Sequence, residues 1–150
     1  MSDKAKNILI LICYFLLAVV LLSSIGIWLP VLIDIFNKDK VSEEVMHSLP
    51  GNILTYALGL FLIAIIDRSI YLLFKTSQYQ NNILEFFVIA FIFLITSFFV
   101  FCSLKSLKGQ YYIDAHSYAK YVMFISWGAW LYVKFRGTKD SNYSAIGGVI

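Results

Sequence analysis

Residues 51–74 of the chain read GNILTYALGLFLIAIIDRSIYLLF, and the two charged residues in this stretch are Asp67 and Arg68. An apolar run of about 18 residues or more is typical of a helix that spans a membrane. A charged side chain that faces lipid at the centre of such a helix costs about 2.5–3.5 kcal/mol on insertion scales. We therefore expect Asp67 and Arg68 to face protein or water, or to extend to the membrane surface.

The composition indicates a membrane protein rather than a soluble domain. Of the 150 residues, 60% are hydrophobic and 14% are charged, whereas globular proteins average about 45–50% and about 25%. The net charge of +3 is spread over the connections and gives no reason to expect direct nucleic-acid binding. Cys13 and Cys102 lie in separate apolar runs without a metal-ligand pattern, so we expect no disulfide, metal or other cofactor.

The apolar runs predict an all-α membrane protein with four transmembrane helices in an antiparallel bundle, folded as a single domain over residues 1–150. We expect the helices at residues 8–36, 52–74, 83–104 and 119–135, followed by a short, mainly polar tail at 137–150. The first run is much longer than the ~7–15 apolar residues of a secretory signal, which predicts an uncleaved helix. Pro30 would kink this helix or begin a short interfacial segment.

The polar connections carry weaker signals. In the connection 37–50, Ser42 followed by two glutamates is typical of a helix start, which predicts a helix of one or two turns that ends before Pro50. Asp34 is expected at the water boundary. The short connection 75–82 makes the second and third predicted helices antiparallel neighbours, and the tyrosines of 105–118 indicate an interfacial segment.

The pairing of the charged residues follows from this hairpin. Glu85 lies near the start of the third predicted helix, on the same membrane side as Arg68. Because an arginine side chain can extend toward the interface, we predict a bridge between Arg68 and Glu85. Asp67 would instead be held by Tyr71, one turn further on, or by Lys75.

Polar and aromatic residues follow i, i+3, i+4 spacing down one face of the fourth predicted helix. They are His116, Lys120, Met123, Trp127, Trp130 and Lys134. In the simpler interpretation, the ends of this stripe extend to the interfaces and the tryptophans pack against other helices. In the other, His116, Lys120, Trp127 and Trp130 line a pore or contact a ligand or a second subunit.

Basic residues favour placing both termini in the cytoplasm. With four spans, seven basic residues fall on the side of the termini and five on the other side, and the positive-inside rule assigns the richer side to the cytoplasm. The seven are Lys4, Lys6, Arg68, Lys75, Lys134, Arg136 and Lys139, and the five are Lys38, Lys40, Lys105, Lys108 and Lys120.

The sequence contains none of the catalytic motifs GxSxG, HExxH, GxGxxG or the P-loop, so we expect a protein that is not an enzyme. The two histidines, His47 and His116, fall in different connections. A bundle of four helices has little interior room for a substrate beside its own packing. A transport path would more naturally form between several copies, so we expect a homo-oligomer in the lipid bilayer.

The four-span layout and the hairpin that begins with residues 51–74 resemble the membrane subunits of the Kiwa anti-phage defence systems of bacteria. The resemblance implies an inner-membrane oligomer that responds to phage and signals to a cytosolic, DNA-binding partner protein. The resemblance assigns no functional role to any particular residue of this chain. The layout is also similar to immunity proteins against pore-forming bacteriocins. Three hypotheses follow: a sensor or scaffold in defence, a subunit of an ion channel or small transporter, and an immunity protein.

Overall fold

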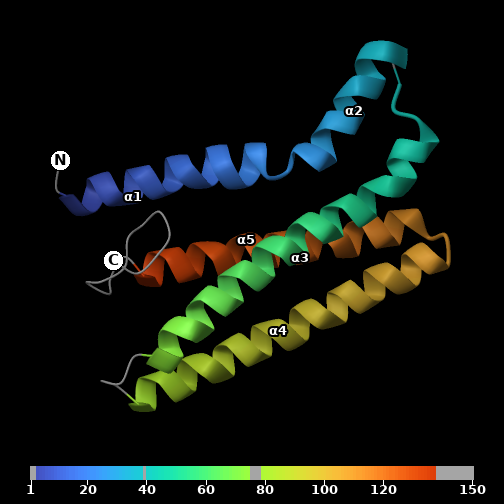
Figure 1. Ribbon diagram of the computed structural model, residues 1–150. Helices are drawn as coiled ribbons and strands as arrows, with labels where there is room; N and C mark the ends of the chain where they lie inside the picture. The colour runs from blue at the N-terminus through green and yellow to red at the C-terminus, as the bar shows by residue number, and fades with distance from the viewer. Residues whose placement is uncertain (1–2, 39, 75–78, 138–150) are drawn as a thin grey trace.

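The computed structural model describes residues 3–38, 40–74 and 79–137, and within these ranges its regular elements are all helices, without a strand (Figure 1). The chain forms α1 (Asp3–Tyr14), the π-helix η1 (Phe15–Leu22), α2 (Ile25–Lys38), α3 (Glu43–Phe74), α4 (Tyr79–Lys108) and α5 (Tyr112–Gly137). The all-helical prediction is therefore confirmed for the described residues. The predicted tail at 137–150 lies outside them from residue 138 onward.

Among the described residues, two helices are long and apolar enough to cross a membrane, or three if the bent pair at the start of the chain is one span. They are Glu43–Leu72 and Ile83–Lys108, and the bent pair is Ile8–Leu22 with Ile25–Asn37. The 32 residues of α3 are about 48 Å long at 1.5 Å per residue. This length exceeds the ~30 Å of a hydrocarbon core, so α3 extends beyond it.

The last helix, α5, packs against both α3 and α4 (Figure 1). It runs in the same direction as α3 and opposite to α4. Small side chains allow the close approach, since Ala57 on α3 and Ala119 on α5 are both fully buried. On the α4 side, the hydroxyl of Ser103 donates a hydrogen bond to the carbonyl oxygen of Ala115 at 2.9 Å.

The first apolar run is not the single helix that the sequence predicts over residues 8–36. It is broken at Ser23 and Ser24, where η1 and α2 meet with a bend of 55°. The hydroxyl of Ser23 donates to the carbonyl oxygen of Ala18 at 2.7 Å, and that of Ser24 donates to the carbonyl oxygen of Val20. Serine hydroxyls that compete for helix carbonyls bend helices, whereas Pro30 lies inside α2, beyond the bend.

Side chains from α3 and α5 bind carbonyl groups along this bent segment. The hydroxyl of Tyr56 on α3 donates to the carbonyl oxygen of Val19 at 2.8 Å and accepts from the indole N–H of Trp127 on α5 at 2.9 Å. The amide of Asn52 donates to the carbonyl oxygen of Gly26 at 3.3 Å. Gly26 lies four residues before Pro30, which has no N–H to offer it. These hydrogen bonds attach the bent segment to α3 and, through Tyr56, to α5.

Three further boundary predictions are corrected. First, α3 begins at Glu43 as predicted but continues through Pro50 instead of ending there. Second, Asp34 is buried rather than at the water boundary, because it accepts hydrogen bonds from the backbone N–H of Ser42 at 2.9 Å and from its hydroxyl. Asp34 thereby links the end of α2 to the start of α3.

Third, most of the predicted connection 105–118 is helical. Only a tight turn at residues 109–111 separates α4 from α5. The N–H of Tyr111 bonds the carbonyl oxygen of Ser106 at 2.9 Å, and that of Gln110 bonds Leu107 at 3.1 Å. With Gln110 in the left-handed conformation (φ 62°), this is a Schellman motif, which ends a helix and reverses the chain at once. Consequently α5 begins at Tyr112.

Candidate functional site

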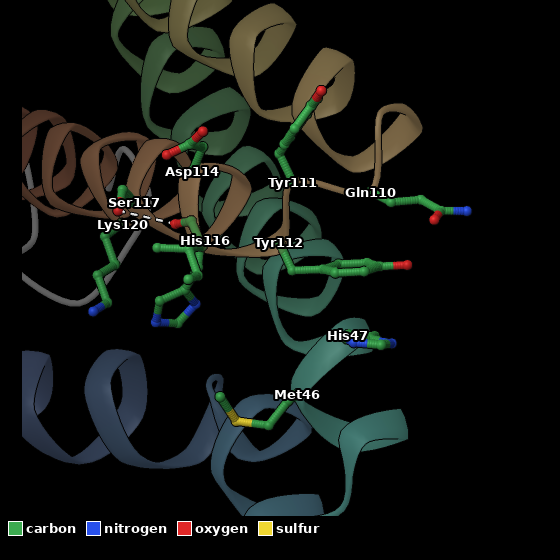
Figure 2. Close-up of a pocket in the computed structure, with 10 residues that line it drawn as sticks. Met46, His47, Gln110, Tyr111, Tyr112, Asp114, His116, Ser117 and Lys120 are labelled. Atoms are coloured by element: carbon green, nitrogen blue, oxygen red, sulfur yellow. Dashed lines mark hydrogen bonds between the residues drawn. The ribbon is translucent and has the colours of Figure 1, made fainter.

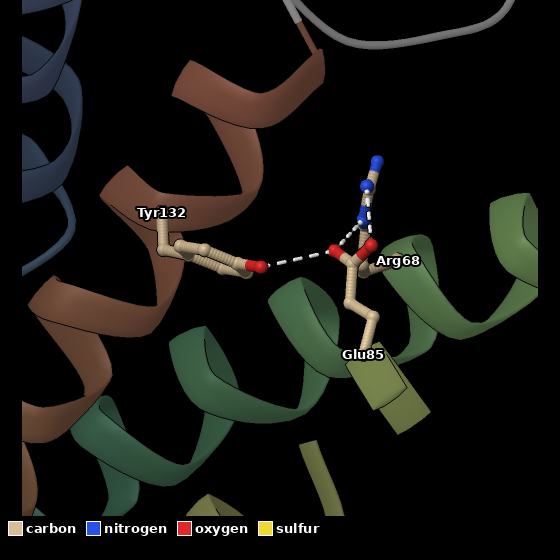
Figure 3. Close-up of polar contacts among 3 residues, drawn as sticks. All are labelled: Arg68, Glu85 and Tyr132. Atoms are coloured by element: carbon tan, nitrogen blue, oxygen red, sulfur yellow. Dashed lines mark hydrogen bonds and ion pairs between the residues drawn. The ribbon is translucent and has the colours of Figure 1, made fainter. Parts of the chain in front are cut away.

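A buried ion pair joins the end of α3 to the start of α4 (Figure 3). The guanidinium of Arg68 donates from Nε to Oε1 of Glu85 at 2.7 Å and from Nη2 to Oε2 at 3.0 Å. The two residues are 3% and 7% exposed. The bridge predicted between Arg68 and Glu85 is therefore present, with two parallel hydrogen bonds that fix the orientation of both side chains.

The fifth helix also contributes to this pair. The hydroxyl of Tyr132 on α5 donates to Oε1 of Glu85 at 3.1 Å (Figure 3). The guanidinium carbon Cζ of Arg68 lies over the ring of Tyr71, 4.8 Å from the ring centroid. We call Arg68, Glu85 and Tyr132 the three-helix clamp, because each comes from a different helix.

Asp67 has a partner that the sequence did not suggest. Its carboxylate lies 3.5 Å from the ammonium of Lys134 on α5. Lys75, one of the predicted partners, lies outside the described residues. The ammonium of Lys134 is also 6.0 Å from the ring centroid of Trp130, so α5 is attached to α3 at the same end as the clamp.

The burial of the Arg68–Glu85 pair determines how much the clamp contributes to the stability of the protein. Removing one partner of a buried ion pair typically costs about 3–5 kcal/mol, because the other charge is left without compensation. An exposed ion pair contributes only about 0–1 kcal/mol. The Arg68–Glu85 pair belongs to the first class and the partly exposed Asp67–Lys134 pair lies closer to the second.

The predicted stripe on α5 separates into two parts. Trp130 is 5% exposed and its ring packs against Phe15, with centroids 5.5 Å apart, and against Tyr14. Trp127 meets the edge of Phe15 at 5.9 Å. The first helices of the chain therefore cover the tryptophans, whereas His116 and Lys120 lie beyond this packing.

His116 and Lys120 line a pocket of about 750 Å³ at the end of the bundle opposite the clamp (Figure 2). The pocket lies between the start of α3 and the α4–α5 turn. His47 from α3 stacks on Tyr112 from α5, with ring centroids 3.8 Å apart and planes 10° apart. The structure thus brings the two histidines, which the sequence places in separate connections, to one pocket.

His116 precedes the apolar part of α5. Burial lowers its pKa below the usual value, and the nearby positive charge of Lys120 lowers that pKa further. The neutral imidazole is therefore the favoured form in the pocket. The sequence placed His116 and Lys120 on one helix face, but it did not predict that His47 and the turn before Tyr112 would meet them at one pocket.

The described residues contain no group of three histidine, cysteine or acidic side chains placed to hold a metal ion. Cys13 is exposed and Cys102 is half-buried, and both are free thiols.

We predict that replacing Arg68 with leucine destabilises the protein by about 3–5 kcal/mol, since the carboxylate of Glu85 then stays buried without its guanidinium. The matched control is Lys105→Leu, which removes an exposed positive charge on α4 and should change stability by about 0.5 kcal/mol or less. Thermal unfolding of both variants in detergent, followed by circular dichroism, measures the difference. Equal melting temperatures would show that the clamp does not stabilise the bundle.

Comparison of the chain with protein-family models, with curated proteins and with solved structures found no match.

Proposed function

We propose that the protein is a multi-pass membrane subunit with four spans. The first span is α1 with η1, and the others are residues 52–74 of α3, 83–104 of α4 and 119–135 of α5. The position of α5 supports the fourth span: it packs against α3 and α4, and Phe15 of η1 covers its tryptophans. A helix shielded from lipid by its neighbours tolerates a lower hydropathy than one that faces lipid.

Both termini lie in the cytoplasm in this proposal. The larger number of basic residues on the side of the termini supports this orientation. The clamp then lies near the cytoplasmic surface, and the pocket of His116 and Lys120 lies near the opposite surface. The bend after η1 turns α2 away from the direction of the first span.

The function that we propose is that of a non-enzymatic sensor or scaffold of the bacterial inner membrane, which takes part in anti-phage defence and signals to a cytosolic partner protein. The role in defence rests on the resemblance of the four-span layout to the membrane subunits of the Kiwa systems, and the three-helix clamp supports the structural part of the proposal. Arg68 and Asp67, the charged residues within the second span, both contact charged partners in the same chain. Charges used in this way favour a structural role over a path for ions.

We further propose that the subunit forms a homo-oligomer through α4. Its outward side carries a row of bulky apolar side chains, each more than half exposed in the single chain. They are Leu84, Phe87, Phe91, Leu94, Phe98 and Phe101. Their alternating spacing of three and four residues is that of a helix–helix seam, so a second copy of α4 fits this face.

The topology is tested with reporter fusions in bacterial cells. Alkaline phosphatase fused after Gln110 should be active, because this turn is expected outside the cytoplasm. A green fluorescent protein fused at residue 150 should fluoresce, because it folds in the cytoplasm. The reversed pattern, with an inactive phosphatase and a dark fluorescent protein, would contradict the orientation.

The assembly and the partner are tested by purification in a mild detergent from the native host. We expect one oligomeric species by native mass spectrometry, together with a co-purifying cytosolic protein. Phe98→Ala, on the α4 row, should reduce the oligomer, whereas Ile63→Ala should not, although Ile63 on α3 is similarly exposed (66% against 62%). A monomer without any partner would refute the scaffold function.

A further inference from the structure

The pocket at the outer end of the bundle has a cationic side. His116 and Lys120 are one turn apart on α5 and point into the same space, toward the helices that precede α3 (Figure 2). The acidic residue among the described lining residues is Asp114, and its carboxylate points to the other side of α5 (Figure 2). The imidazole of His116 and the ammonium of Lys120 therefore face the same space. An anion bound there would neutralise the positive charge of the ammonium.

The walls of the pocket are aromatic and apolar. The stacked rings of His47 and Tyr112 form one wall, and Met46 borders the same space. Beside it, Tyr111 and Ile113 expose 67% and 85% of their surface. Aromatic rings beside exposed apolar side chains and a lysine are typical of the level where lipid headgroups meet acyl chains.

We propose that this pocket binds the phosphate group of an anionic phospholipid. The phosphate lies between His116 and Lys120, where the ammonium supplies a fixed positive charge and the imidazole a hydrogen-bond donor. The glycerol and the first acyl carbons then lie over Met46 and Ile113. The proposal depends on the membrane location of the chain but not on its role in defence.

The charge state of His116 is tied to whether an anion is bound. Burial lowers the pKa of His116 in the empty pocket, and the positive charge of Lys120 lowers that pKa further. A bound phosphate reverses this effect, because a negative charge near an imidazole favours its protonated form. Basic pockets between transmembrane helices bind anionic lipid headgroups on the cytoplasmic side of membranes, and we propose the same chemistry for this pocket at the opposite end of the bundle.

The test is native mass spectrometry of the full-length protein in detergent, with titration of phosphatidylglycerol or of the zwitterionic phosphatidylcholine. Both lipids carry the phosphate, but in phosphatidylcholine the choline cation offsets its charge and would lie close to Lys120. We therefore expect phosphatidylglycerol, with its net negative charge, to bind about fivefold more tightly or better. The double variant His116→Gln/Lys120→Gln should lose this preference. Lys105→Gln, which removes an exposed charge from α4, should keep it.

A single variant and a titration with inorganic phosphate complete the test. Lys120 is exposed, so Lys120→Gln alone tests the site if the double variant does not fold, as judged by circular dichroism. Inorganic phosphate that binds the delipidated protein while phosphatidylglycerol does not would overturn the lipid assignment in favour of a soluble phosphate compound. Equal affinities of the two lipids, or an undiminished preference in the variants, would overturn the proposal. The reporter fusions test topology separately, so failure here leaves the four-span proposal standing.

Discussion

The structure depends on the burial of Arg68 and Glu85, two opposite charges that neither lipid nor an apolar core accommodates singly. Because the guanidinium and the carboxylate must meet, the end of α3 and the start of α4 are held together. Tyr132 adds α5 to the same carboxylate. At the other end of the bundle α3 and α4 diverge (Figure 1), and α5 packs against both. One ion pair thus sets where three helices converge.

A second constraint acts on the backbone of the first apolar run. Inside a membrane, carbonyl groups released by a bend need donors, since lipid offers none. Tyr56 and Asn52 on α3 supply them to Val19 and Gly26. The bend and α3 therefore stabilise each other, and α5 joins through Trp127. The same arrangement covers the tryptophans and leaves His116 and Lys120 at the open end of the bundle opposite the clamp.

The sequence predicted the features that rest on strong local constraints. A charge inside an apolar run is rare and needs a partner at the same depth, so the Arg68–Glu85 bridge could be inferred from a short connection between two helices. The contacts of Asp67 with Lys134 and of Tyr132 with Glu85 could not be inferred from the sequence. They depend on how α5 is rotated against α3 and α4. The pocket was missed because the Schellman turn at Gln110 makes α5 longer than its apolar segment.

The most direct test of the clamp is a charge exchange in which Arg68→Glu and Glu85→Arg are combined and compared with each single variant by thermal unfolding in detergent. Each single variant places two like charges in the buried site and should be strongly destabilised. If the pair itself holds the helices, the double variant should recover much of the lost stability, with a coupling free energy of about 1–3 kcal/mol. Additive losses in the double variant would contradict the account.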